Sequence, residues 1–228
     1  MLAAASFAQA QTASVTVSGS ITPGTCTMSL GGGGAAAFGK LDRTTVKSWP
    51  IAGVPARFLS PTPQNVSLLV NCSTPTKMAI RVTDNRAATA SPGITTDPAS
   101  YGLGTYTAPG GTAQNIGIFA IDHSDLKIKA TTAATAAAPA VTLISAGLAT
   151  ATSTWAAATA AAPGNPVVNF LSAYSFGFST SAAAATPDSL VSIAGNLKVS
   201  IQPIVTVVDS STTNIVLDGS ATVSLIGL

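Results

Sequence analysis

Apolar and polar residues alternate in residues 11–22, QTASVTVSGSIT, near the start of the chain. Val15, Val17, Gly19 and Ile21 share one face of an extended backbone, and serine and threonine residues occupy the other face. This period of two predicts a half-buried β-strand. A glycine in the apolar face weakens a self-contained strand, because it adds no side chain to the packing. The segment therefore suits a strand that lies in the groove of another molecule.

Short runs of β-branched and aromatic residues recur along the rest of the chain and are separated by Gly, Pro, Asn and Asp. They cover residues 65–72, 77–83, 116–121, 167–171, 174–178, 195–208 and 220–228. Residues 73–76 are predicted to form a turn, and Asp218-Gly219 a hairpin turn before the last strand. Many short strands joined by such turns predict an all-β protein, either a sandwich or a barrel.

Residues 130–165 lack this pattern and are dominated by alanine and threonine. Alanine favours helix, but the threonines and the absence of charged pairs four residues apart weaken that interpretation. We expect an insertion of short helical turns or loose structure, anchored by burial of Trp155.

Charged residues make up only 8% of the 228 residues, and the net charge is +2. Typical soluble domains carry about 25% charged residues. The ten basic residues are scattered, which argues against nucleic acid as a partner. A surface with so little charge instead favours association with other protein molecules.

The N-terminal residues 1–10, MLAAASFAQA, end in a small-x-small pattern typical of a signal-peptidase site. They are predicted to be the remnant of a secretory signal, the alternative being an ordinary apolar tail. No apolar run reaches the roughly 18 residues needed to span a bilayer, so no integral membrane segment is predicted.

The two cysteines, Cys26 and Cys72, fit a secreted protein. In an oxidising compartment an even number of cysteines usually forms disulfides, so these two are predicted to be bonded. A metal site would need more Cys or His ligands, and a nucleophilic cysteine would need a base nearby.

Groups that could perform catalysis are few. The single histidine, His123, lies between Asp122 and Ser124, and consecutive residues cannot all point into one site, so a surface turn is expected there. Gly31-Gly32-Gly33-Gly34 is expected to be a flexible turn, because no Lys-Ser/Thr follows it as in a phosphate-binding loop.

Asp84-Asn85-Arg86 is expected to cap a strand end, with Asp84 accepting from local amides and Arg86 pairing with Asp84 or a backbone carbonyl. Binding of a cation or ligand is the alternative. We therefore predict no enzymatic activity, no catalytic residues, no cofactor and no metal site.

Taken in order, these features resemble a chaperone–usher pilin of Gram-negative bacteria. They are the signal remnant, the alternating N-terminal strand with its glycine, Cys26 after that strand, and Cys72 at the end of a later strand. Further motifs are similar to an incompletely characterised fimbrial-type family, over essentially the whole chain after residue 10. They are Val70-Asn71-Cys72 with Pro75, Asp84-Asn85-Arg86-Ala87, Tyr101-Gly102-Leu103-Gly104, and residues 217–223, LDGSATV.

The resemblance implies an immunoglobulin-like β-sandwich, residues 23–228, that lacks its last strand and exposes an apolar groove. A periplasmic chaperone would fill the groove until the N-terminal extension of the next subunit, residues 11–22, replaces it. Val15, Val17 and Ile21 would be buried there, and Gly19 would match a small donor residue. The disulfide would tie the first strand to the strand that ends at Cys72.

The function implied is a structural subunit of an extracellular fimbria. It would be secreted through the periplasm, pass an outer-membrane usher, and polymerise with its own copies or with other pilus subunits. The alternative is a tip adhesin in which Trp155, Tyr101 or Tyr106 contacts a glycan. A secreted hydrolase has little support, since the chain offers no catalytic constellation. Whether the subunit belongs to the shaft or the tip stays open.

Overall fold

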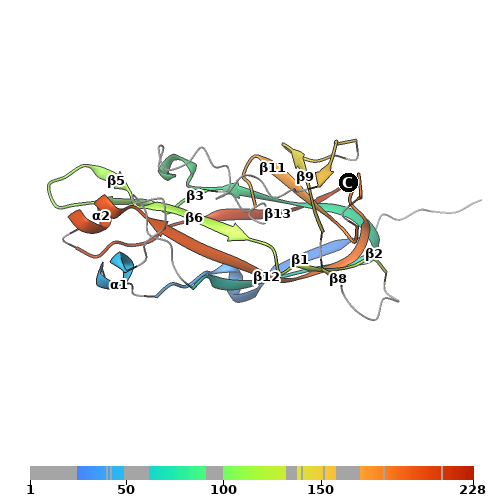
Figure 1. Ribbon diagram of the computed structural model, residues 1–228, viewed down its shortest axis with the longest axis horizontal. Helices are drawn as coiled ribbons and strands as arrows, with labels where there is room; N and C mark the ends of the chain where they lie inside the picture. Colours follow the sequence, from blue (N-terminus) through green and yellow to red (C-terminus); the bar gives the residue numbers. More distant parts are fainter. Residues whose placement is uncertain are drawn as a thin grey trace, which may run out of the picture.

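The computed structural model describes most of the chain after residue 24 (Figure 1). The described residues are 25–39, 41, 43–48, 62–90, 100–131, 138–139, 141–150, 152–157, 170–181, 183–211 and 213–228. The predicted signal remnant, residues 1–10, and the predicted donor strand with Val15, Val17, Gly19 and Ile21 lie outside the described residues.

Strands dominate the described residues, with four short helices between them. The strands are β1 (Cys26–Leu30), β2 (Gln64–Asp84), β3 (Tyr101–Gly102), β4 (Thr105–Thr107), β5 (Ala113–Asn115), β6 (Gly117–Asp122), β7 (Lys127–Lys129), β8 (Ala138–Pro139), β9 (Val141–Ala146), β10 (Ala156–Ala157), β11 (Tyr174–Ser179), β12 (Ser189–Pro203) and β13 (Ala221–Gly227). The helices are the 3-10 turns η1 (Gly31–Gly34) and η2 (Ala87–Thr89), and the α-helices α1 (Arg43–Lys47) and α2 (Val205–Ser210).

The long strand β2 joins the two layers of a sandwich, because its two halves pair with different neighbours. Its first half pairs with β1 and β12, and this layer continues through β6 to β3. Its second half pairs with β13 and β11, and that layer continues through β9 to β10. All of these pairings are antiparallel. The all-β prediction is confirmed, whereas completion of the sandwich by a donor strand stays a prediction.

The core lies between the two layers and follows the alternation of the strands. In the first half of β2, Val66, Leu68 and Val70 are buried while the residues between them are exposed. Phe176 and Phe178 of β11 enter the same core from the other layer. Burial of one face of each strand is the main stabilising contribution expected for such a sandwich.

The turn predicted at residues 73–76 is wrong, because these residues continue β2 from one layer into the other. Their backbone stays within the ladder: the Ser73 amide donates to the Thr25 carbonyl at 2.9 Å, and Thr76 pairs with Leu190. A strand predicted over residues 195–208 also needs correction, because β12 ends at Pro203 and α2 follows it. Proline has no backbone N–H to donate to a ladder, which accounts for the end of the strand there.

The described part of the segment 130–165 forms strands β8, β9 and β10 rather than helical turns. The sequence of β9, VTLISA, contains the β-branched residues Val, Thr and Ile, which favour strands, and this strand pairs with β11 along its whole length. Trp155 is only 8% exposed and packs in a cluster with Ala79 and Ala149, as predicted.

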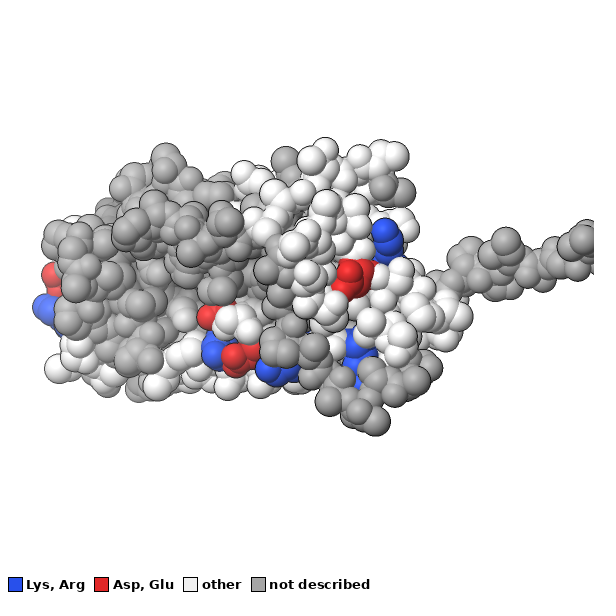
Figure 2. All heavy atoms as spheres, turned by 45° about the vertical axis from the view of Figure 1, so that its right-hand side comes forward, with Lys and Arg blue, Asp and Glu red and all other residues white. Residues whose placement is uncertain are grey.

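Among the described residues on the face shown in Figure 2, the charged side chains are few and lie between uncharged residues. Three ion pairs, Lys47–Asp209, Arg86–Asp218 and Lys198–Asp125, join partly exposed side chains. Among the residues that the structure describes, none of the helices has both the length and the apolar character that crossing a membrane requires.

Candidate functional site

A groove with mainly apolar side chains and a volume of about 460 Å³ opens between the chain that follows β1 and the chain that leads into β13. Residues 30–38 form one wall, and residues 217–223 form the other. The floor belongs to the main core and consists of Val66, Phe119, Ile121, Leu197 and Ile201. We call this feature the edge groove.

The two strands beside the edge groove, β1 and β13, are edge strands. Within the described ranges each of them pairs with β2 alone. An edge strand presents a row of N–H and C=O groups that another strand can pair with. Leu30 of β1 and Val223 and Leu225 of β13 pack against the core but are only partly buried. Among the described residues, this edge of the sandwich is apolar and only partly covered.

Local sequence creates the space along the first wall. Gly32, Gly33 and Gly34 in η1 have φ angles of 59°, 66° and 80°, a left-handed conformation that glycine adopts without strain. The predicted glycine turn is therefore a tight 3-10 turn that redirects the chain after β1. Ala35 and Ala36 follow, and their small side chains fill little space along this wall of the groove.

A second pocket, of about 820 Å³ and lined by both apolar and polar residues, adjoins the edge groove near α1 and α2. Both pockets are lined by Ala36 and Phe38 from the first wall and by Leu217 from the second wall. Val46 of α1 and Val208 of α2 are buried against each other where they line this second pocket.

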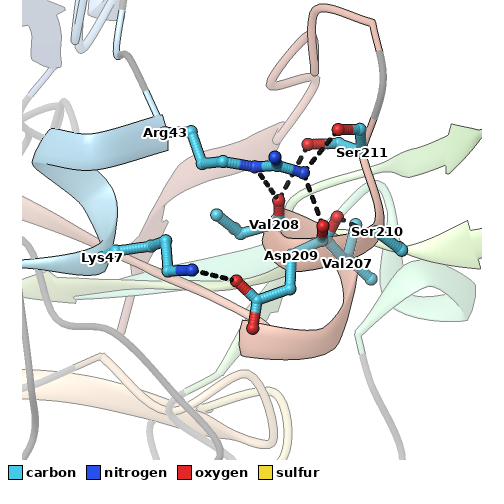
Figure 3. A network of polar contacts seen from close by, with 7 residues as sticks. All are labelled: Arg43, Lys47, Val207, Val208, Asp209, Ser210 and Ser211. Atoms are coloured by element: carbon cyan, nitrogen blue, oxygen red, sulfur yellow. Dashed lines mark hydrogen bonds and ion pairs between the residues drawn. The ribbon is translucent and has the colours of Figure 1, made fainter.

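Arg43 fastens α1 to the end of α2 (Figure 3). Its Nε donates to the Val208 carbonyl at 2.8 Å, and its Nη2 donates to the carbonyls of Asp209 and Ser211 at 2.5 and 2.6 Å. Lys47 adds an ion pair to the Asp209 carboxylate at 2.8 Å. The last carbonyls of a helix lack partners within the helix, so a positive side chain that satisfies them stabilises the helix end.

The predicted disulfide is confirmed: Cys26 and Cys72 are bonded and are register partners in the β1–β2 ladder. The bond ties the edge strand β1 to the strand that joins both layers. The strand that contains Cys72 does not end there, since β2 continues to Asp84.

The expected surface position of His123 is wrong. His123 is only 2% exposed, and its ring stacks on Phe170 with 4.3 Å between ring centroids. The edges of Phe176 and Phe178 meet the same ring. Burial lowers the pKa of His123 to about 3 from an ordinary value of 6.5. The His123 ring is therefore neutral and packs as one member of an aromatic cluster.

This burial predicts a loss of stability in acid. The unfolded chain takes up a proton at His123 below about pH 6.5, whereas the folded chain resists protonation down to about pH 3. Stability from the neutral ring is therefore complete above pH 6.5 and is lost as the pH falls toward 3. Between pH 7 and pH 4 the free energy of unfolding should fall by about 3 kcal/mol through this residue.

The matched variant is His123→Phe, which keeps an aromatic ring but cannot titrate. Urea denaturation at both pH values should show a smaller acid-induced loss for the variant, by about 3 kcal/mol. Equal losses in the two proteins would mean that His123 does not carry this pH dependence. The comparison cancels the titration of carboxylates, which both proteins share.

The other residues singled out from the sequence are placed as follows. Tyr101, Tyr106 and Trp155, the aromatics considered for glycan contact, are buried, with exposures of 0%, 6% and 8%. The Asp84 carboxylate accepts from the Arg86 amide at 2.7 Å, as expected, but the Arg86 side chain pairs with Asp218 rather than with Asp84. Among the described residues no three His, Cys, Asp or Glu side chains gather as metal ligands would.

Asp218-Gly219 does not form the predicted two-residue hairpin, since no strand immediately precedes it. The chain reaches β13 from α2, and the Asp218 amide donates to the Leu103 carbonyl at 3.0 Å. A hairpin needs two neighbouring antiparallel strands in sequence, which this segment lacks.

The walls of the edge groove were not predicted from the sequence. One available signal was the apolar face formed by Ala221, Val223 and Leu225 at every second position. Another was the run of small residues after Leu30, which leaves a strand neighbour with little side-chain volume.

Comparison with known proteins adds one match. Residues 15–120, somewhat less than half of the chain, match the model of a family described as a protein of unknown function (DUF1120). No curated protein and no solved structure matches the chain. The matched segment begins within the predicted donor strand and includes both cysteines as well as Val66 and Phe119 of the groove floor. Over this segment the chain is similar to that family.

Proposed function

We propose that this protein is a structural subunit of an extracellular fimbria and that it polymerises by strand donation. Residues 11–22 of one copy fill the edge groove of the next copy. A periplasmic chaperone occupies the groove before polymerisation, and an outer-membrane usher passes the subunit to the cell surface. The roles of the chaperone and the usher are inferred from the resemblance to fimbrial proteins. The groove is observed among the described residues.

The observation that carries this proposal is the edge groove between the two edge strands β1 and β13. Its floor is the apolar core itself, and its walls hold partly buried Leu30, Leu217 and Val223. An added strand would bury this apolar surface and pair with the free edge of β1 or β13. Both contributions favour binding, because exposed edges and exposed apolar patches each promote association.

Residues 11–22 have the pattern and the length that such an occupant needs. Twelve residues in a strand extend about 40 Å, enough to follow the whole of β13 with residues to spare. In a donated strand, the period of two would place Val15, Val17 and Ile21 on the side that faces the core, and the serine and threonine residues on the side that faces water. Each of the three apolar side chains contributes about 1.5 to 3 kcal/mol when fully buried.

Deleting residues 11–21 tests the proposal in cells that produce the matching chaperone and usher. The shortened subunit keeps its groove, so it should still be recovered with the chaperone, but it should form no filaments visible by electron microscopy. A control with Ser14→Ala and Ser18→Ala alters only the polar face and should assemble normally. Filaments of normal length from the deletion would contradict strand donation.

A further inference from the structure

Three short segments that lie far apart in the sequence meet where the chain enters β13. They are the end of β2 with the following turn, residues 84–89; β3 with the residues after it, 101–104; and residues 217–222, which lead into β13. Leu103, Leu217, Gly219, Ser220 and Ala221 from these segments also line the edge groove. We call the polar contacts among the three segments the β13 entry network.

Asp84 joins the first two segments. Its Oδ1 accepts a hydrogen bond from the Arg86 amide at 2.7 Å, and its Oδ2 accepts one from the Gly102 amide at 2.9 Å. Two amide donors satisfy one carboxylate, an arrangement in which the charged acceptor strengthens both bonds. The nearby Tyr101 is buried, and this burial, together with the charge of Asp84, raises the pKa of Tyr101. The tyrosine hydroxyl therefore stays protonated and donates to the Phe170 carbonyl at 3.0 Å.

Asn85 connects the first segment to the third. Its backbone N–H donates to the Ser220 carbonyl, and its side-chain Nδ2 donates to Ser220 Oγ, each at 3.0 Å. Its Oδ1 accepts from Thr222 Oγ1 at 3.1 Å. One exposed side chain thus holds both the last residue before β13 and the second residue of that strand.

Asp218 connects the third segment to the other two. Its carboxylate pairs with Arg86, and its amide donates to the Leu103 carbonyl at 3.0 Å. Thr89 completes the network, because its Oγ1 donates to the Arg86 carbonyl at 2.8 Å and accepts from the Gly104 amide at 3.0 Å.

Backbone packing in the network is close enough to require glycine. A Cβ at Gly102 would lie 2.2 Å from the Arg86 carbonyl oxygen and 2.8 Å from the Ala90 amide nitrogen, both of which are backbone atoms. Gly104 has a φ of 95° and lies against Asp218. The segments can therefore approach one another only with glycine at these positions.

We propose that the β13 entry network is a positioning device for the edge groove: it holds β13 at the distance and register at which the groove can accept a strand. This inference rests on the proposed function. Along its length β13 pairs with β2, and among the described residues no second strand forms a ladder along its outer edge. The network supports β13 at the end that lines the groove.

The experiment measures binding of a labelled peptide with the sequence of residues 11–22 to the full-length chain, kept dilute enough to be monomeric. Asn85→Ala removes the side-chain contacts to Ser220 and Thr222, and Asp84→Ala removes the link to Gly102. We expect the peptide Kd to rise about threefold or more for Asn85→Ala and about tenfold for Asp84→Ala. Hydrogen exchange of the β13 amides should become faster in both variants.

Asp188→Ala is the matched control. The Asp188 carboxylate also accepts from a backbone amide, that of Thr180 at 2.7 Å, between the end of β11 and the start of β12, but neither residue lines the edge groove. The control should lose a similar degree of resistance to urea and keep the Kd and the β13 exchange rate of the unaltered protein.

Each outcome decides one point. If the unaltered protein binds the peptide and both network variants bind it equally well, the positioning role is wrong while the proposed function stands. If Asp188→Ala weakens binding as much as Asp84→Ala, general loss of stability explains the effect and the inference also fails. If the unaltered protein does not bind the peptide, the proposed function itself fails.

Discussion

Replacing both Cys26 and Cys72 with alanine is expected to lower the free energy of unfolding by about 4 kcal/mol. The disulfide closes a loop with a sequence separation of 46 residues, and the loss of its restraint on the unfolded chain gives a value of about 4 kcal/mol. For a chain of this size the midpoint of thermal unfolding should fall by roughly 8 to 16 °C. Urea denaturation and thermal scans under non-reducing conditions measure both quantities.

The control alters the neighbouring register pair, Thr27 and Asn71, to alanine. These residues are exposed and lie on the same two strands, but no covalent bond joins them. Surface substitutions of this kind usually change stability by about 0.5 kcal/mol or less. A double cysteine variant that loses no more stability than this control would contradict a stabilising role for the disulfide.

The disulfide also bears on the edge groove. β1 is an edge strand whose described pairing is with β2 alone, and the bond joins it covalently to that partner. Leu30 at the end of β1 begins one wall of the groove. The bond therefore fixes the first wall, as the β13 entry network is proposed to fix the second.

The strands of this protein were predictable because their signal is local. The alternation in residues 174–178 and 220–228 led directly to β11 and β13, and the cysteine pair led to the disulfide. The errors came where distant residues decide the local structure. Residues 205–208, VTVV, are all β-branched and favour a strand. They nevertheless lie in α2, whose end is capped by Arg43 from 165 residues away.

The environment of His123 and the walls of the edge groove could not be predicted for the same reason: residues that are distant in the sequence form them. His123 lies between polar residues in the sequence, but Phe170, Phe176 and Phe178 cover it in space. The groove walls, residues 30–38 and 217–223, are separated by most of the chain, so no local pattern shows that they face each other. By contrast, Asp84-Asn85-Arg86 was predicted to satisfy local amides, and only its partners in residues 101–104 and 217–222 were missed.

The largest stabilising effect should come from supplying the proposed donor strand within one chain. A chain that starts at residue 23 can carry a copy of residues 11–22 after Leu228, joined by a linker of about four residues that permits a hairpin. The copy would run antiparallel along the outer edge of β13 and place Val15, Val17 and Ile21 in the edge groove. Burial of three apolar side chains and a new ladder, offset by the ordering of the added strand, should give a net gain of about 3 kcal/mol.

The midpoint of thermal unfolding of this fused chain, compared with that of residues 23–228 alone, tests strand donation most directly. The account predicts a rise of roughly 6 to 12 °C. It also predicts that the rise disappears when the added copy carries Val15→Ser, Val17→Ser and Ile21→Ser, because the ladder alone leaves the groove unfilled. Equal midpoints for the fused chain and for residues 23–228 alone would contradict it, since the sandwich would then need no strand from outside.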